Sequence, residues 1–165
     1  MNCRLELAAT PQSIELARRL FLEYRDSLKV DLCFQDFQAE LDSLPGTYAP
    51  PRGRLYLALF DAQTAGCVAL RPLAERRCEM KRLYVRPTYR GHGIGRALTM
   101  QTISAATALG YRELVLDTLP SMQAAQALYA NLGFKDGSEY TFNPVPGTRF
   151  LSRDLTQPEF PSRAV

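Results

Sequence analysis

Apolar residues recur along much of the chain at spacings of three and four, the period of a helix with one buried face. Four segments have this period: residues 11–28, 34–44, 94–109 and 120–132. Thr10 and Pro11 form a helix-start signal before the first segment, and Pro45-Gly46 ends the second. The pattern therefore predicts four helices.

Shorter apolar or alternating runs between these segments are typical of strands. They are residues 4–7, 55–60, 66–70, 78–85, 114–116, 134–140 and 149–155. A turn at residues 61–64 indicates an antiparallel hairpin, which the strand at 78–85 extends. Later strands alternate with helices, so we expect an α/β domain around a mixed sheet, with antiparallel strands first. Ligands of such sheets bind beyond the carboxyl ends of the parallel strands.

A chain of 165 residues has the length of one domain, which we expect to span residues 1–155, followed by a frayed tail at 156–165. Its composition, 46% hydrophobic and 22% charged, is that of a soluble globular protein. No apolar run is long enough for a membrane span, and charges interrupt the first six residues, where a secretory signal would be apolar. We therefore expect a cytoplasmic protein with no membrane partner.

The number and spacing of the cysteine and histidine residues exclude several kinds of metal and catalytic site. The four cysteines, Cys3, Cys33, Cys67 and Cys78, are far apart and form no Cys-x-x-Cys pair, which predicts reduced, buried thiols and no metal site. His92 is the only histidine, so triads and dyads that need one are excluded unless His92 serves.

Positive charge is concentrated rather than large. A net charge of +3 does not imply a nucleic-acid partner. Eight basic residues crowd one stretch: Arg71, Arg76, Arg77, Lys81, Arg82, Arg86, Arg90 and Arg96. A compact polyanion docking there would explain the cluster, and a solvated basic face is the alternative.

Three alternating glycines, Gly91, Gly93 and Gly95, follow the strand at 78–85 and precede a predicted helix. Such a turn presents unpaired backbone N–H groups and the positive end of the helix dipole, so it attracts phosphate. Arg90 and Arg96 on either side add charge.

Two phosphate-binding motifs fail on this turn. The dinucleotide motif would need glycine in place of Arg96, and no Gly-Lys-Ser/Thr of a P-loop occurs. The pattern R-x-x-G-x-G fits, as Arg90, Gly93 and Gly95. Here the chain resembles the GNAT superfamily of N-acetyltransferases, over about residues 53–155. Further matches are Leu128-Tyr129 and Leu132-Gly133-Phe134.

The resemblance implies an acyl-CoA N-acyltransferase fold whose parallel strands, 78–85 and 114–118, splay to admit acetyl-CoA. The backbone of this turn would then hold the pyrophosphate: Arg90, Gly91, His92, Gly93, Ile94, Gly95 and Arg96. The pantetheine arm would pair with Leu83, Tyr84 and Val85, and the Leu83 amide would meet the thioester oxygen. His92 would face solvent beside the phosphates.

A carboxylate is expected to take the proton from the acceptor amine. Glu79 is our first choice by resemblance, and strand alternation places it with Leu83 and Val85 unless a bulge intervenes. A salt bridge to Lys81 or Arg82 is its structural alternative. Asp117 is the second choice for the base, and its alternative role is to cap the turn at Pro120.

Tyr129 matches the tyrosine that protonates the departing thiolate in the family, and a half-buried aromatic with a satisfied hydroxyl is the alternative. Met122 stands where the family often has an asparagine that contacts the coenzyme, so that contact is not expected here.

The resemblance places the acceptor between residues 29–37 and 140–147. Candidate substrate-binding residues there are Phe34, Phe37, Tyr140 and Asn143. A small amine or amino-acid-like acceptor fits, and a peptide amine stays an alternative, as does a non-catalytic acyl-CoA sensor. Homodimers are frequent in the family, so a homodimer is one option.

Overall fold

The computed structural model describes residues 2–32 and 36–158, in which seven strands form one sheet in the order β1-β2-β3-β4-β5-β7-β6. The strands are β1 (Cys3–Leu7), β2 (Arg54–Phe60), β3 (Gln63–Pro72), β4 (Arg77–Val85), β5 (Glu113–Thr118), β6 (Lys135–Asp136) and β7 (Arg149–Asp154). The α-helices are α1 (Pro11–Ser27), α2 (Phe37–Ser43), α3 (Ile94–Ala108) and α4 (Gln123–Asn131). The predicted mixed sheet with four helices is confirmed.

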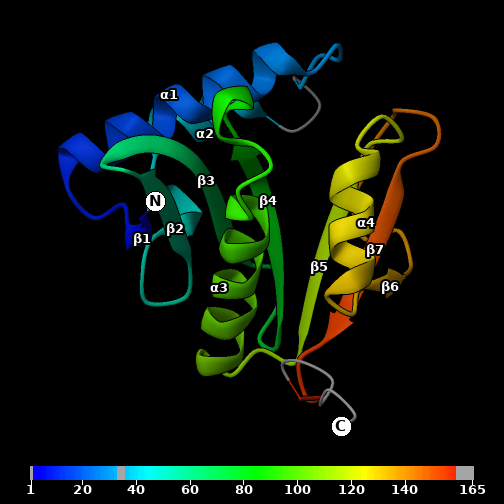
Figure 1. Cartoon of the computed structure of the whole chain (residues 1–165). Helices are drawn as coiled ribbons and strands as arrows, with labels where there is room; N and C mark the ends of the chain where they lie inside the picture. Colours follow the sequence, from blue (N-terminus) through cyan, green and yellow to red (C-terminus); the bar gives the residue numbers. More distant parts are fainter. Residues whose placement is uncertain (1, 33–35, 159–165) are drawn as a thin grey trace, which may run out of the picture.

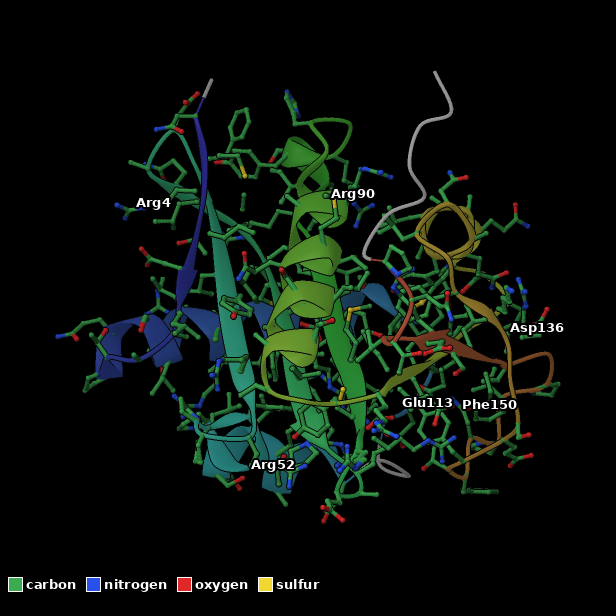
Figure 2. The ribbon with its side chains drawn as sticks, turned by 90° about the horizontal axis from the view of Figure 1, so that it is seen from below. Arg4, Arg52, Arg90, Glu113, Asp136 and Phe150 are labelled. Carbon is green, nitrogen blue, oxygen red and sulfur yellow. The ribbon has the colours of Figure 1, made fainter. Side chains whose placement is uncertain are left out.

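Helices cover both faces of the sheet (Figure 1). The core beneath α1 and α2 includes Phe21 and Leu57, and the core beneath α3 and α4 includes Leu98 and Leu114. The outer strands β1 and β6 carry Arg4 and Asp136, which lie at opposite sides of Figure 2.

The strands β4 and β5 run parallel but pair over only three positions, ending at Glu79 opposite Val115. Beyond that point they separate toward their carboxyl ends, as Figure 1 shows. The β5-facing edge of β4 from Met80 to Val85 therefore has no β5 partner. This is the splay that the resemblance predicted.

A β-bulge interrupts β4 at Arg82, which has a φ of 59°. Pairing with β3 shifts by one residue between Ala69–Lys81 and Cys67–Tyr84. Because of this shift, Leu83 and Val85 pack toward the α3 core, whereas Glu79 lies on the α1/α2 face. The placement of Glu79 with Leu83 and Val85, expected from regular alternation, is wrong for this reason.

The segment after α4 also differs from its prediction. A strand was expected over 134–140, but β6 has only two residues. Residues 137–148 instead form a loop whose polar side chains reach carboxylates on the sheet: Tyr140 bonds to Glu79, and Asn143 to Asp117.

Cys67 and Cys78 are buried free thiols, but Cys3 is exposed because it lies on the edge strand β1, contrary to the prediction. Cys33, Phe34 and residues 159–165 of the predicted tail lie outside the described residues. Within the described ranges, no helix is long and apolar enough to cross a membrane. The same ranges contain no group of three or more His, Cys, Asp or Glu side chains that could hold a metal ion.

Candidate active site

The separation of β4 and β5 opens a cleft with about 540 Å³ of empty space, part of it open to solvent. Its lining comes from both helical layers, both strands and the loop after β6. The lining residues are Tyr24, Leu28, Leu32, Met80, Lys81, Arg82, Leu83, Leu116, Asp117, Leu119, Tyr129 and Asn143. Segments distant in the sequence thus meet at the carboxyl ends of the parallel strands, where ligands of such sheets bind.

The glycine turn lies exposed at the carboxyl end of β4. Gly91 and Gly93 have φ values of 81° and 74°, which favour glycine even though a Cβ would meet nothing within 4 Å at either position. The Ala97 N–H donates to the Gly93 carbonyl at 3.0 Å, so the amides of residues 94–96 have no partner within α3. These amides are therefore the donors that the start of α3 could offer an anion.

Much of the basic stretch is neutralised inside the fold, so neither a docked polyanion nor a solvated basic face is needed to explain those residues. Its ion pairs are Arg71–Glu79, Arg77–Glu113, Arg82–Glu40 and Arg86–Glu23. Arg90 and Arg96 are exposed beside the glycine turn, and the Arg90 Nε donates to the Val85 carbonyl at 3.0 Å. Figure 2 shows Arg90 beside α3.

His92 is exposed on the glycine turn and does not line the cleft. Its ring lies 4.8 Å from that of Phe60, centroid to centroid. The surface position agrees with a neighbour of the phosphates.

Glu79 is fully buried, and both of its carboxylate oxygens accept a hydrogen bond. The Arg71 Nε donates to Oε1 at 2.7 Å, and the Tyr140 hydroxyl donates to Oε2 at 2.6 Å. Burial and the charge of Glu79 raise the pKa of Tyr140, so its hydroxyl keeps the proton that it donates. Glu79 thus forms an ion pair with Arg71, which the sequence did not indicate, and it does not line the cleft.

Asp117 lies at the end of β5 and lines the cleft, partly exposed. Its Oδ2 accepts a hydrogen bond from the Asn143 Nδ2 at 3.0 Å. Two residues predicted to bind substrate, Tyr140 and Asn143, therefore hold the two carboxylates that were predicted as bases.

Two tyrosines reach the cleft from opposite layers, Tyr129 from α4 and Tyr24 from α1. Burial raises the pKa of Tyr24 to about 12 and also raises the pKa of Tyr129, so both phenols are protonated at neutral pH. Among the described residues, the Tyr129 hydroxyl has no hydrogen-bond partner.

Lys81 was missed as a site residue, although it lines the cleft. Alternation on β4 could have revealed it, because Lys81 lies two residues after Glu79 and shares its face. Phe37, by contrast, is 4% exposed and packs in the α1/α2 core, where its ring lies 5.0 Å from the Arg82 guanidinium carbon. The cleft geometry does not favour its predicted substrate contact.

Comparison with known proteins places this geometry in a family. The sequence model of the acetyltransferase (GNAT) family matches residues 14–134. An uncharacterized N-acetyltransferase of Schizosaccharomyces pombe is 36% identical over 158 residues, covering 94% of this chain and 97% of that protein.

Solved structures show the same fold. A GNAT-family acetyltransferase from Staphylococcus aureus Mu50 superposes with a TM-score of 0.77 at 21% identity, covering 93% of this chain and 99% of that one. The PaiA N-acetyltransferase from Thermoplasma acidophilum, solved in complex with coenzyme A, gives 0.69 at 18% identity over 93% and 99% of the two chains.

Proposed function

The chain belongs to the GNAT acetyltransferase family and is an acyl-CoA-dependent acetyltransferase, and from this premise we propose that it transfers an acetyl group to a primary amine by direct attack in the β4–β5 cleft. The main support for this proposal is that the groups needed for the reaction lie close together. An exposed glycine turn follows the carboxyl end of β4, and a free strand edge, a carboxylate and a protonated phenol line the cleft where β4 and β5 separate.

The turn and the strand edge suit acetyl-CoA. The Arg90 amide already donates to the Pro87 carbonyl at 3.2 Å, so the amides of residues 91–96, together with the exposed side chains of Arg90 and Arg96, would hold the pyrophosphate at the start of α3. The edge of β4 at residues 83–85 would pair with the pantetheine arm. The Leu83 amide would donate to the thioester oxygen as charge develops there.

We assign the base to Asp117, acting directly or through one water. It is partly exposed in the cleft, whereas Glu79 is fully buried with both oxygens engaged. As the amine nitrogen bonds to the acetyl carbon, Asp117 takes its proton. Glu79 holds Tyr140, and it remains the alternative base through a water chain.

The acid is Tyr129, which lines the cleft and whose phenol keeps its proton at neutral pH. As the carbon–sulfur bond breaks, the phenol gives its proton to the leaving sulfur.

Tyr129→Phe is expected to lower kcat about 100-fold. This is the lower end of the range for general acids, because a thiolate is already a fair leaving group. Steady-state thiol release measures it, and unchanged kcat would remove Tyr129 from the mechanism.

Acetyl-CoA at about 100 times its Kd is expected to stabilise the protein by about 2.7 kcal/mol, which raises Tm by about 5–10 °C for a chain of this size. Thermal unfolding followed by circular dichroism measures the shift. Pantetheine, which lacks the pyrophosphate, is the matched control and should give a much smaller shift. No shift at millimolar acetyl-CoA would argue against the proposed binding site.

Thiol release over a panel of amines, amino acids and peptides tests the chemistry. An acetyl-CoA-induced shift without amine-dependent thiol release from any acceptor would favour the sensor alternative. We propose a small amine as the acceptor class because the cleft space is limited and must also hold the end of the pantetheine arm.

A further inference from the structure

We propose that Glu40 is a positioning residue for acetyl transfer: it holds the Arg82 side chain, which fixes the β4 bulge and so aims the Leu83 amide at the thioester oxygen. The proposal rests on the function proposed above and adds to it a residue of α2 that does not line the cleft. It follows from the backbone of the bulge, from the side chains that hold it and from the strand partner that β4 lacks beside it.

The bulge has a backbone conformation that its own sequence does not favour. Arg82 has a φ of 59°, in the left-handed region, where the Cβ of an ordinary residue is crowded. Such a residue persists only where the surrounding structure holds it in place. Sheet pairing holds this part of β4 from the β3 side only, because β4 has no β5 partner beyond Glu79. Contacts from outside the sheet therefore decide how firmly the bulge is held.

The Arg82 side chain makes such a contact with α2. Its Nε and Nη2 donate to the two carboxylate oxygens of Glu40 at 2.8 and 3.1 Å, and the two side chains are only 3% and 15% exposed. A guanidinium that bonds to both oxygens of a carboxylate is fixed in direction as well as in place. Its carbon also lies 5.0 Å from the centroid of the Phe37 ring. The bulge residue is thus fastened to α2 through a buried ion pair.

Glu40 is itself held in position. The hydroxyl of Tyr48, which is 2% exposed, donates to the Glu40 Oε1 at 2.8 Å. Burial and the charge of Glu40 raise the pKa of Tyr48, so the hydroxyl keeps the proton that it donates. On the β3 side, the Cys67 Sγ donates to the Arg82 carbonyl at 3.4 Å. Contacts therefore run without a break from Tyr48 through Glu40 to Arg82.

The bulge immediately precedes Leu83, whose amide is proposed above as the donor to the thioester oxygen. Such a donor acts only if it is aimed at the place where charge develops, and a misplacement of about 1 Å can cost about 100-fold in rate. This charge is present in the transition state and not in bound acetyl-CoA. Loss of the aim should therefore lower kcat and leave the binding of acetyl-CoA nearly unchanged.

Arg82→Gly and Arg82→Ala separate the bulge from the charge of Arg82. Both remove the guanidinium, but only glycine adopts a positive φ at no steric cost. Arg82→Ala is expected to lower kcat for thiol release about 10- to 100-fold, with a change of less than about threefold in the KM of acetyl-CoA. Arg82→Gly should recover about fivefold of that loss. Equal kcat values in the two variants would overturn the proposal, as would a loss confined to the KM of the acceptor, because Arg82 also lines the cleft.

Glu40→Gln tests the positioning residue itself. It removes the charge that holds the guanidinium and is expected to lower kcat about 10-fold in the presence of Arg82. In an Arg82→Gly background the same change should leave kcat as it is, because glycine needs no anchor. The double variant Glu40→Gln/Arg82→Gly also leaves no unpaired buried carboxylate, so it guards against loss of folding. Equal effects of Glu40→Gln in both backgrounds would show that Glu40 does not act through Arg82.

Nuclear magnetic resonance gives a readout that needs no acceptor. At saturating ligand, acetyl-CoA should move the Leu83 amide proton of the wild type downfield relative to coenzyme A, because a hydrogen bond to the thioester oxygen deshields that proton. The difference should shrink in Arg82→Ala and largely return in Arg82→Gly. Its absence from the wild type, or the same difference in all three proteins, would overturn the proposal. Thiol release by the wild type would still support the proposed function, whereas no binding of acetyl-CoA and no thiol release with any amine would refute it.

Discussion

Asp117→Asn is expected to lower kcat by about three orders of magnitude, within the range of about 10² to 10⁴ for loss of a general base. Asparagine keeps the size of the side chain, and its carbonyl oxygen can still accept the hydrogen bond that Asn143 donates at 3.0 Å. What it cannot do is take a proton from the amine. The measurement is kcat from thiol release at saturating acetyl-CoA and acceptor.

Glu79→Gln is the matched control, because it makes the same carboxylate-to-amide change on the neighbouring strand. Glu79 is fully buried and paired with Arg71, so its replacement should mainly lower the free energy of unfolding, measured in urea, with only a small effect on kcat. The reverse result, near-normal kcat in Asp117→Asn and a collapse of kcat in Glu79→Gln, would transfer the role of base to Glu79.

The sequence predicted those parts of the fold that depend on local pattern. The strand at 78–85 and the helix at 94–109 were predicted within a residue of β4 and α3, because apolar periodicity and punctuating proline and glycine are local signals. The glycine turn between them was predicted as an exposed anion site for the same reason. Gly91 and Gly93 adopt the positive φ that such a turn requires.

Contacts between distant residues were not predictable in this way. The bulge at Arg82 places this side chain against Glu40, 42 residues earlier, and nothing near Arg82 in the sequence announces that pairing. Likewise, the strand expected over 134–140 is mostly loop, and Tyr140 of this loop bonds to Glu79, 61 residues away. A single sequence specifies alternation, but tertiary partners decide where it breaks.

These long-range contacts also explain how the site stays assembled although its strands do not pair there. The loop after β6 is attached to β4 through Tyr140 and to β5 through Asn143. It therefore links the last β4–β5 pair, at Glu79, to Asp117, which lies beyond that pair on β5. Hydrogen bonds from this loop thus hold the two carboxylate side chains, while sheet pairing holds their backbones.

Gly93→Asp is expected to weaken acetyl-CoA binding at least about 100-fold. A Cβ at Gly93 would meet nothing within 4 Å, and Asp tolerates the left-handed conformation at φ 74° better than most residues. The new carboxylate would lie where the pyrophosphate is proposed to bind. Two unit charges about 5 Å apart repel by about 3 kcal/mol at an effective dielectric constant of about 20, before screening by salt.

Gly93→Asn is the control that separates the effect of the new negative charge from the effect of adding a side chain of that size. Asparagine is nearly isosteric and tolerates the same φ, so it shares any steric or backbone cost, and its loss of affinity should be much smaller. A carboxylate at the start of α3 is favoured by the helix dipole, so Gly93→Asp should fold at least as stably as Gly93→Asn. Isothermal titration with coenzyme A at two salt concentrations measures both variants. Because added salt screens the repulsion, the difference in Kd between the variants should shrink as salt rises, and equal Kd values at low salt would mean that no phosphate lies on this turn.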